Sequence, residues 1–471
     1  MRKLSPIVLG ASMLLSMPTL AVDTTSWQPV TEPSPRQVIL IVGDGMDDQQ
    51  ITIARNYLKG AQGRLLLDQM PLRSTSQILT IEDKLNGSPV YVADSANTAT
   101  TMATGVITSR GRIATSAGSD NDLTTIVELA HANGYKTGVV TTASVTDATP
   151  ASFAAHIGLR FCENPDAMVN VTSHDIVLGD CSQDLKKNGG KGSISEQLAE
   201  SDLDVILGGG SKHFAPQAEG QSITVSQLAE KNGFLIVENP QELTNANKAK
   251  KLLGLFSPST MPVKLQGQDG RAAEEPEPSF LNSLHHYLGD VTLPEVMNCE
   301  ANPAFSAIPT LKQMTDAALL HLSQDNDKGF FLMIESASID KQSHERKPCG
   351  SIGELEQLNE SLASALKFAA THPRTLILVT ADHAQAAQLI PNVSLFEKFP
   401  IPTYTPGKLA RIHTPEGSIM AVNYATTNFQ MEEHTGANVP LFSNDEGKDL
   451  VPSFVQQTQL FEIMSDYLQL N

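Results

Sequence analysis

The chain is poor in positive charge. Its 471 residues include 33 lysines and arginines against 52 aspartates and glutamates, which gives a net charge of -19. This balance argues against nucleic acid and against an anionic membrane as partners, because both attract basic proteins. An acidic protein that acts on an anionic substrate needs local positive charge, which bound cations and an arginine could provide.

Long apolar runs are also scarce. The one candidate covers residues 4–20, follows the basic pair Arg2 and Lys3, and ends in a plausible cleavage sequence. It predicts a signal peptide over residues 1–21, and therefore export to the periplasm or secretion. A membrane anchor is the alternative, but the run is short and no second one follows it.

The rest of the chain predicts one large domain. Residues 22–36 are polar and rich in proline, which is typical of an N-terminal arm. Strand and helix patterns then alternate, with helices expected over residues 121–131, where the start is acidic, and over residues 352–370. The mixed residues 211–307 indicate insertions rather than a second domain. We expect a single catalytic domain over residues 37–471, with no internal repeat.

Cysteine is sparse as well. The four cysteines show no Cys-x-x-Cys spacing, which argues against a cysteine zinc site. An even number in an exported chain predicts disulfides. Among the three possible connectivities we favour the pairing of neighbours, Cys162 with Cys181 and Cys299 with Cys349.

Three apolar runs that end in acidic residues are the most informative feature present. They cover residues 37–44, 330–335 and 375–382. Each predicts a buried parallel strand with a carboxylate at its C-terminal end. In doubly wound sheets the ligand crevice lies beyond these ends. We therefore expect an α/β fold with a doubly wound, mostly parallel sheet and helices on both faces.

Carboxylates gathered at strand ends predict a cation site, because like charges repel in a partly dry crevice. His344, His383 and His434 favour a borderline metal such as zinc, and oxygen-rich positions remain for magnesium. Asp340 lies four residues before His344, so on a helix both would face one metal. A solvated helix face is the alternative for that pair.

Ser95 is the candidate nucleophile. Residues 95–104 predict a helix, and amides at its N-terminus would bind an anion beside Ser95. The alternative is that Ser95 only caps this helix. No Gly-x-Ser-x-Gly motif surrounds it, which argues against an esterase triad, so a bound metal would activate the hydroxyl.

Two further segments supply groups for magnesium and phosphate. Asp147 and Thr149 follow a predicted strand over residues 136–142 and offer hard oxygen ligands. Arg160 presents a planar guanidinium that would hold two oxygens of a phosphoryl group. An isolated arginine is more often a surface residue, so the prediction depends on the pattern as a whole.

In this order the segments resemble the alkaline phosphatase family, in particular its enterobacterial periplasmic type. The matching stretches are Gly43-Asp44-Gly45-Met46, Val92-Ala93-Asp94-Ser95-Ala96, Asp147-Ala148-Thr149-Pro150, Gly190-Lys191-Gly192-Ser193, Leu207-Gly208-Gly209-Gly210, residues 335–344, Thr380-Ala381-Asp382-His383 and Glu433-His434-Thr435-Gly436. They cover almost all of the chain after the signal peptide, and all of them in register are specific.

The resemblance implies hydrolysis of phosphate monoesters through a phosphoserine at Ser95, with two zinc ions and one magnesium ion per subunit. The implied ligands are Asp340, His344 and His434 for the first zinc; Asp44, Asp382 and His383 for the second; and Asp44, Thr149 and Glu335 for magnesium, with Asp147 holding a bound water. Arg160 would hold the phosphate, and Asp94 would orient the Arg160 side chain. Lys341 would reach the phosphate through water. The family also implies broad specificity, an alkaline optimum and a homodimer.

Three positions depart from the family pattern. Asp47 replaces a usual glycine, Asn97 replaces a smaller residue, and Gln385 replaces a histidine. These changes put the groups behind the metal ligands in question, not the ligand set, so metal preference and rate could differ from those of relatives.

Two other functions compete with this interpretation. A phosphodiesterase or sulfatase of the wider superfamily is one, but the sequence after Ser95 lacks the proline and arginine of sulfatases, and phosphodiesterases typically use a threonine. A non-catalytic periplasmic protein that binds phosphate or metal is the other, and the complete nucleophile set argues against it.

Overall fold

The structure, a computed structural model, describes residues 35–173, 176–247, 249–285, 288–392 and 406–470. The predicted signal peptide, and the predicted arm as far as residue 34, lie outside the described residues. Among the described helices, none is long and apolar enough to cross a membrane.

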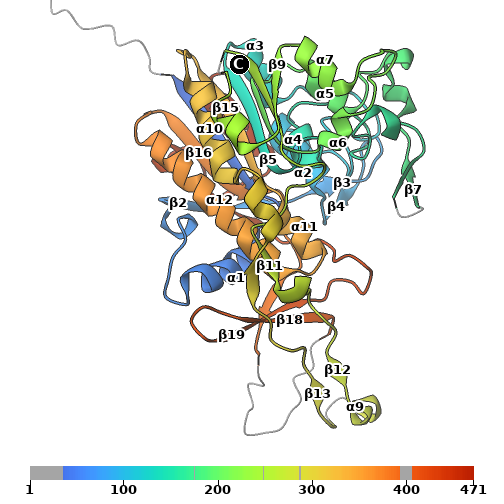
Figure 1. The fold of residues 1–471 in the computed structure, drawn as a ribbon, viewed down its shortest axis with the longest axis vertical. Helices are drawn as coiled ribbons and strands as arrows, with labels where there is room; N and C mark the ends of the chain where they lie inside the picture. The colour runs from blue at the N-terminus through green and yellow to red at the C-terminus, as the bar shows by residue number, and fades with distance from the viewer. Residues whose placement is uncertain (1–34, 174–175, 248, 286–287, 393–405, 471) are drawn as a thin grey trace, which may run out of the picture. The chain divides into compact units, whose positions relative to one another are not determined.

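A ten-stranded sheet organises residues 35–471 (Figure 1). In spatial order its strands are β21 (Phe454–Gln456), β2 (Leu72–Gln77), β20 (Val439–Ser443), β16 (Thr375–Ala381), β1 (Arg36–Gly43), β15 (Gly329–Ser336), β5 (Lys136–Ser144), β8 (Val205–Gly209), β10 (Lys251–Leu255) and β9 (Phe234–Val237). All neighbours from β16 to β9 are parallel, and β20 is antiparallel to both β16 and β2. The predicted α/β fold with a mostly parallel sheet is confirmed.

Helices cover both faces of this sheet. They are α1 (Asp48–Lys59), α2 (Ser95–Thr104), α3 (Ile126–Ala132), α4 (Ala148–Ala151), α5 (Ile194–Glu200), α6 (Ser211–Phe214), α7 (Val225–Lys231), α8 (Pro240–Thr244), α9 (Phe280–Leu284), α10 (Leu311–Ser323), α11 (Ser338–His344), α12 (Pro348–Ala369) and α13 (Thr458–Leu468). Helices α1, α10 and α12 pack on one face, while α2, α3 and α13 pack on the other.

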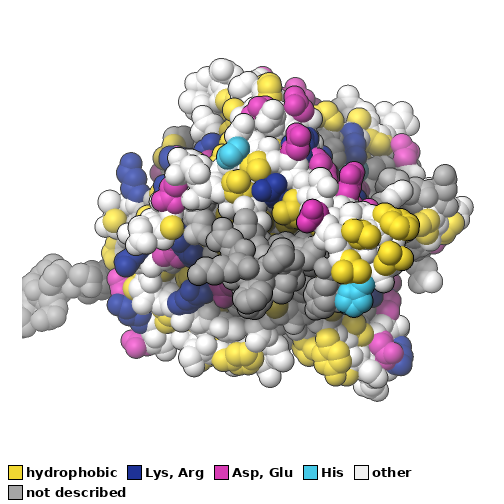
Figure 2. Space-filling model, turned by 90° about the horizontal axis from the view of Figure 1, so that it is seen from below, with side chains coloured by type: hydrophobic (Ala, Val, Ile, Leu, Met, Phe, Trp, Pro, Cys, Tyr) yellow, Lys and Arg dark blue, Asp and Glu magenta, His cyan; other side chains and the backbone are white. Residues whose placement is uncertain are grey.

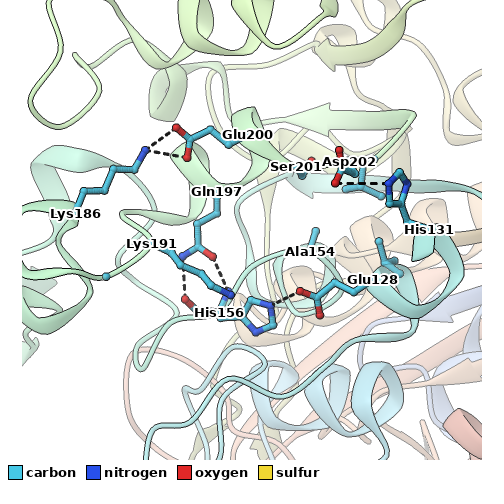
Figure 3. A pocket seen from close by; sticks show the side chains of 13 residues that line it. Glu128, His131, Ala154, His156, Lys186, Lys191, Gln197, Glu200, Ser201 and Asp202 are labelled. Carbon is cyan, nitrogen blue, oxygen red and sulfur yellow. Dashed lines mark hydrogen bonds and ion pairs between the residues drawn. The ribbon is translucent and has the colours of Figure 1, made fainter. Parts of the chain in front are cut away.

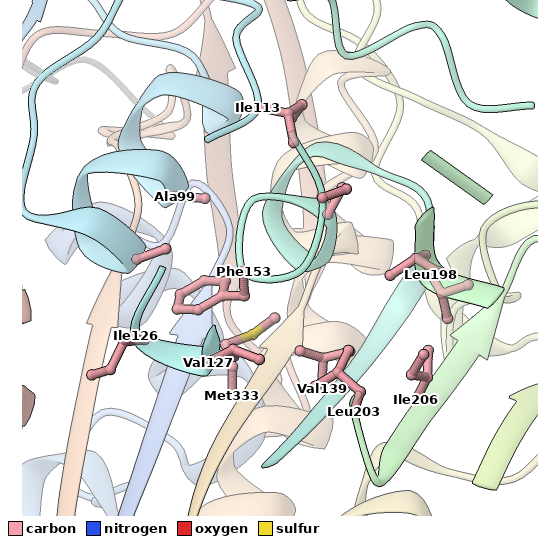
Figure 4. Close-up of a cluster of buried hydrophobic side chains, with 14 of the residues drawn as sticks. Ala99, Ile113, Ile126, Val127, Val139, Phe153, Leu198, Leu203, Ile206 and Met333 are labelled. Carbon is pink, nitrogen blue, oxygen red and sulfur yellow. The ribbon is translucent and has the colours of Figure 1, made fainter. Parts of the chain in front are cut away.

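The alternation of side chains along β1 shows how the two cores form. Val38, Leu40 and Val42 join one buried cluster, and Ile39 and Ile41 join the other. Successive strand residues point to opposite faces, so an apolar run without alternation buries both. Figure 4 shows the first cluster, which packs side chains of α2 and α3 against the sheet.

Shorter sheets lie in the insertions and loops. They pair β3 (Thr80–Ile81) with β4 (Pro89–Val90), β6 (Val171–Ser173) with β7 (Ile176–Gly179), β11 (Leu265–Gly267) with β14 (Cys299–Ala301), β12 (Glu277–Pro278) with β13 (Val291–Thr292), and β19 (Ile419–Tyr424) with β17 (Gln388–Ile390) and β18 (Lys408–His413). On the face seen in Figure 2, hydrophobic side chains gather in small groups among charged ones.

Two predicted helix boundaries were wrong. The helix expected over residues 121–131 begins at Ile126, because Thr125 and Glu128 form a capping box that fixes its start. Asp122, expected in its first turn, instead forms a bridge with Thr115. The helix expected from residue 352 begins earlier, at Pro348, where proline is well suited to the first turn.

Both predicted disulfides are present. Cys162 is bonded to Cys181, and Cys299 is bonded to Cys349. The first closes the excursion that carries β6 and β7, and the second attaches the insertion with β14 to the start of α12. Disulfides of this kind are expected of an exported protein.

The aromatic contact in the first core cluster should be a major source of stability. Phe331 is fully buried, and its ring stacks on Phe153 with centroids 5.8 Å apart. We expect Phe331→Ala to lower the free energy of unfolding by about 3–5 kcal/mol, the usual loss for a buried phenylalanine. Thermal and urea unfolding would measure it, with Phe280→Ala at a 78% exposed position as the control. An equal loss in both variants would contradict the assignment.

Candidate active site

Four adjacent strands bring acidic residues to one edge of the sheet. Asp44 follows β1, Glu335 lies near the end of β15, Asp382 follows β16, and Asp147 lies beyond β5. The parallel register sets Gly43 beside both Ser336 and Ala381, so the strand ends are level. The structure therefore gathers carboxylates at this edge, as the sequence indicated. Burial raises the pKa values of two of them, Asp44 and Glu335.

Ser95 opens α2 and faces this edge. Asp94 caps the helix, and Asn97 completes a capping box with it. The Ser95 Oγ lies 3.1 Å from Nε2 of His383 and 3.5 Å from Oδ1 of Asp44. Because Asp94 and Asn97 already cap α2, the Ser95 hydroxyl is left facing the cluster.

Asp44, Asp382 and His383 form one group suited to a metal ion. Nε2 of His383 lies 3.3 Å from Asp44 and 3.4 Å from Asp382, and burial lowers its pKa, which favours the neutral imidazole. Oδ2 of Asp382 is buried without a hydrogen-bond partner. Burial, with the neighbouring carboxylates Asp340 and Asp382, raises the pKa of Asp44. A cation at this point would bind the unpartnered oxygen of Asp382 and would offset the repulsion that Asp44 experiences from the neighbouring carboxylates.

This arrangement differs from a hydrolase triad. In a triad the carboxylate faces Nδ1 of the histidine, opposite the serine. Here Nδ1 of His383 faces the carbonyl of Ala384 at 3.3 Å, and the serine and both carboxylates converge on Nε2. Convergence of several donors on one point is the arrangement of a metal site.

A second group comprises Asp340, His344 and His434. Helix α11 carries Asp340 and His344 on one face, as predicted, with Nε2 of His344 3.2 Å from Oδ2 of Asp340. His434 lies 3.4 Å from Asp340, and the two histidine Nε2 atoms are 3.0 Å apart. His383 also comes close enough to share a metal with Asp340 and His434.

The tautomers of this second group suit a metal. Nδ1 of His344 faces the carbonyl of Glu432, and Nδ1 of His434 faces the carbonyl of Ala93 at 2.8 Å. With Nδ1 donating, both Nε2 lone pairs point inward. Burial opposes protonation of His434, but Asp340 raises its pKa to about 9.

The third predicted ligand set lies around Glu335. Burial raises the pKa of Glu335, and the Thr141 hydroxyl donates to its carboxylate. The hydroxyl oxygen of Thr149 is buried without a hydrogen-bond partner, as expected for an oxygen that ligates a hard cation. The two carboxylate oxygens of Asp147 pair with Arg160 and Lys341, which distinguishes Asp147 from a residue that would bind a metal directly.

Arg160 and Lys341 provide the positive charge of the site. Arg160 contacts Asp147 at 2.9 Å and Asp94 at 3.3 Å, and Asp94 also accepts from the Gly111 amide at 3.0 Å. Nζ of Lys341 pairs with Asp147. Burial opposes ionisation of Asp147, but Lys341 and Arg160 hold its pKa well below the ordinary value.

The three departures from the family pattern have structural roles. Asp47 is buried and caps α1, accepting from the amides of Gln49 and Gln50, and burial raises its pKa to about 6. Asn97 completes the capping box of α2. Gln385 donates from Nε2 to Oδ1 of Asp340 at 2.6 Å, so it contacts a predicted zinc ligand directly.

Sequence reasoning missed a polar group near Asp147, in which His213 is buried and Glu163 is partly buried. Glu163 accepts from the Thr146 hydroxyl and pairs with Nε2 of His213 at 3.1 Å, while Asn164 contacts Nδ1 of that histidine. Burial raises the pKa of Glu163 to about 7 and lowers that of His213 to about 4. No sequence spacing marks this group, because its members come from separate loops.

A cavity of about 570 Å³ lies apart from these residues (Figure 3). Two ion pairs form between side chains that line it: Glu128 with His156 at 3.0 Å and Lys186 with Glu200 at 2.8 Å. None of the predicted site residues lines it. The strand-end cluster is therefore the candidate active site.

Comparison with known proteins identifies the family to which the chain is similar. A family model described as alkaline phosphatase matches residues 35–428. The chain is 38% identical to alkaline phosphatase of Escherichia coli (strain K12) over 98% of this chain and 91% of that protein. It is 36% identical to streptomycin-6-phosphate phosphatase of Streptomyces griseus, over 96% of this chain and 95% of that protein. The structure of alkaline phosphatase from the Antarctic bacterium TAB5 shares the fold, with a TM-score of 0.63, 23% identity, and coverage of 93% of this chain and 100% of that one.

The raised pKa of Glu163 predicts a pH effect. Its carboxyl titrates near 7 when folded against an ordinary value of 4.5. Between these values the folded state retains a proton that the unfolded state loses, so this carboxyl costs stability as pH rises. We expect Glu163→Gln to gain up to about 3 kcal/mol relative to the parent between pH 4.5 and pH 8.

Unfolding of metal-free parent and variant at the two pH values would measure this gain. Glu462→Gln, at an exposed position of α13, is the control. The same difference between parent and Glu163→Gln at both pH values would contradict the prediction.

Proposed function

The chain belongs to the alkaline phosphatase family and is a phosphoric monoester hydrolase, and we propose that it transfers the phosphoryl group of its substrates to Ser95. The observation that carries this proposal is the position of the Ser95 hydroxyl. It lies at the start of α2, 3.1 Å from His383 and 3.5 Å from Asp44, within a cluster of metal-ligand side chains. Water would then cleave the phosphoserine.

The residues present fit two zinc ions and one magnesium ion per subunit. Support comes from the unpartnered buried oxygens of Asp382 and Thr149 and from the facing Nε2 atoms of His344 and His434. The proposed ligands are Asp340, His344 and His434; Asp44, Asp382 and His383; and Asp44, Thr149 and Glu335, with Asp147 behind the last set. When bound, the cations would neutralise charge and lower the pKa of the serine hydroxyl and of attacking water.

The chain's own cationic groups would hold the phosphoryl oxygens. Arg160 is positioned by Asp94 and Asp147, so its guanidinium is already oriented when substrate arrives. Lys341 pairs with the second carboxylate oxygen of Asp147, the one that Arg160 does not contact. Positioning and charge neutralisation are the main requirements of phosphoryl transfer, and this set meets both.

Substrate range follows from what these residues recognise. Arg160 and Lys341 would contact the phosphoryl group, and the leaving group would point towards solvent. Recognition of the phosphoryl group alone favours broad specificity. We expect an alkaline optimum, as the family name implies. A phosphodiesterase is the competing activity, and two ester groups would have to fit beside Arg160.

Export and assembly belong to the same proposal. The two disulfides support a periplasmic or secreted protein, as do the signal-peptide features of residues 1–21. We expect a homodimer, as in the family, and static light scattering of the mature protein would measure its mass.

The proposal is tested by hydrolysis of p-nitrophenyl phosphate at alkaline pH. We expect chelation to abolish turnover, zinc with magnesium to restore it, and Ser95→Ala to lower kcat by at least about 10³-fold, since the nucleophile is lost. Turnover by metal-loaded protein that is indifferent to Ser95 would sink the serine mechanism. Preference for bis-p-nitrophenyl phosphate would favour the phosphodiesterase.

Arg160 should matter for phosphate binding in particular. Loss of its charged hydrogen bonds in Arg160→Ala is expected to weaken inhibition by inorganic phosphate about 10- to 100-fold. The control is Arg73→Ala, which removes a half-exposed arginine of β2 paired with Asp48. Equal inhibition constants in Arg160→Ala and the parent would remove Arg160 from the phosphate site.

A further inference from the structure

A buried arginine follows α11, the helix that carries Asp340 and His344. Arg346 lies two residues beyond His344, only 3% exposed, with φ of +59°. Few residues other than glycine adopt this left-handed backbone, which costs about 1 kcal/mol or more unless the surroundings hold it. Here it turns the side chain toward the loop of residues 425–434, which carries His434.

Every hydrogen bond made by the Arg346 guanidinium goes to that loop, among the described residues. Nε donates to Glu432 at 2.7 Å, and the terminal nitrogens donate to the carbonyls of Gln430 at 2.9 Å, Phe429 at 2.9 Å and Thr427 at 3.2 Å. An arginine fork with several acceptors fixes orientation as well as distance. The side chain therefore holds the loop in one conformation.

Glu432 holds the same loop from within. Its side chain is fully buried and accepts from the amides of Thr426 at 2.6 Å and Thr427 at 3.2 Å. Its backbone contacts the first ligand helix twice: the amide donates to the carbonyl of His344 at 2.9 Å, and the carbonyl accepts from Nδ1 of His344. The Glu432 carboxylate thus fixes the position of its own backbone carbonyl, and that carbonyl orients the imidazole of His344.

These contacts join two predicted ligands of one metal. The carbonyl of Glu432 keeps Nε2 of His344 free to bind, and His434 follows Glu432 by two residues. The two Nε2 atoms consequently face each other at 3.0 Å beside Asp340. All of these supporting contacts come from the chain itself.

We propose that Arg346 and Glu432 form a positioning pair that presets His344 and His434 for the first zinc ion. This rests on the proposed function, which assigns those histidines to zinc. A preset site binds more tightly because the ligands need no ordering when the ion enters. A pair that only stabilised the fold would change the unfolding temperature and leave zinc affinity as it is.

The test measures zinc affinity apart from activity. Metal-free parent, Arg346→Met and Arg346→Lys would be titrated with Zn²⁺ against a competing chelator. We expect one of the two zinc sites to lose about 10- to 100-fold in affinity in Arg346→Met, while the other keeps the affinity that it has in the parent. Arg346→Lys keeps the charge beside Glu432 but not the fork, so a smaller loss is expected.

A matched control comes from another arginine–carboxylate pair. Arg55 makes two hydrogen bonds to Asp68, at 2.7 and 2.6 Å, and the pair is partly buried outside the active site. Arg55→Met should lower stability without changing zinc affinity. Activity provides a second measurement, because excess Zn²⁺ should restore kcat in Arg346→Met and shift only the zinc concentration for half-activation.

Zinc affinities in both Arg346 variants within twofold of the parent would overturn the proposal. Failure of both Arg346 variants to fold, with a folded Arg55→Met, would also overturn it, since the pair would then build the fold. If only Arg346→Met fails to fold, Arg346→Lys decides. Parent protein that binds no zinc, or that binds zinc without hydrolysing phosphate monoesters, would instead refute the proposed function.

Discussion

Repulsion among buried carboxylates is the constraint on which the active site depends. Asp44, Glu335 and Asp382 lie on three neighbouring strands, with Asp340 on the following helix. Burial and mutual repulsion raise the pKa of Asp44 well above its ordinary value. The nearby cationic side chains pair with Asp147 and Asp94 instead. Raised pKa values favour protonation of these carboxyl groups, and bound cations would stabilise their charged forms instead, with the surrounding histidines available as softer ligands.

The parallel sheet makes this concentration of charge possible. Its central strands bury apolar side chains on both faces, so their polar ends are the only places where ligands can gather without disturbing a core. Level registers between β1, β15 and β16 then bring residues nearly 340 positions apart into contact, as the bond from Gly45 to Asp382 shows. Helix α2 adds Ser95 from the side, already capped by its neighbours.

Local signals explain what the sequence could predict. The apolar runs before Asp44 and Asp382 revealed their strands because burial on both faces needs unbroken hydrophobicity, and the start of α2 was marked by Asp94. Arg346 and Glu432 gave no such signal. They are 86 residues apart, each is a charged residue in a polar loop, and such residues are usually exposed. Their pairing depends on tertiary packing, as does that of Glu163 with His213.

Differences from relatives should therefore arise behind the ligands. The motifs of the resemblance contain the proposed metal ligands, but the groups that contact these ligands are not part of those motifs: Gln385 on Asp340 and Glu432 on His344. A buried hydrogen bond to a ligand alters its basicity and its freedom to move, and both affect metal affinity. Gln385 does not titrate, so its bond to Asp340 persists across the pH range in which a histidine at this position would lose its charge.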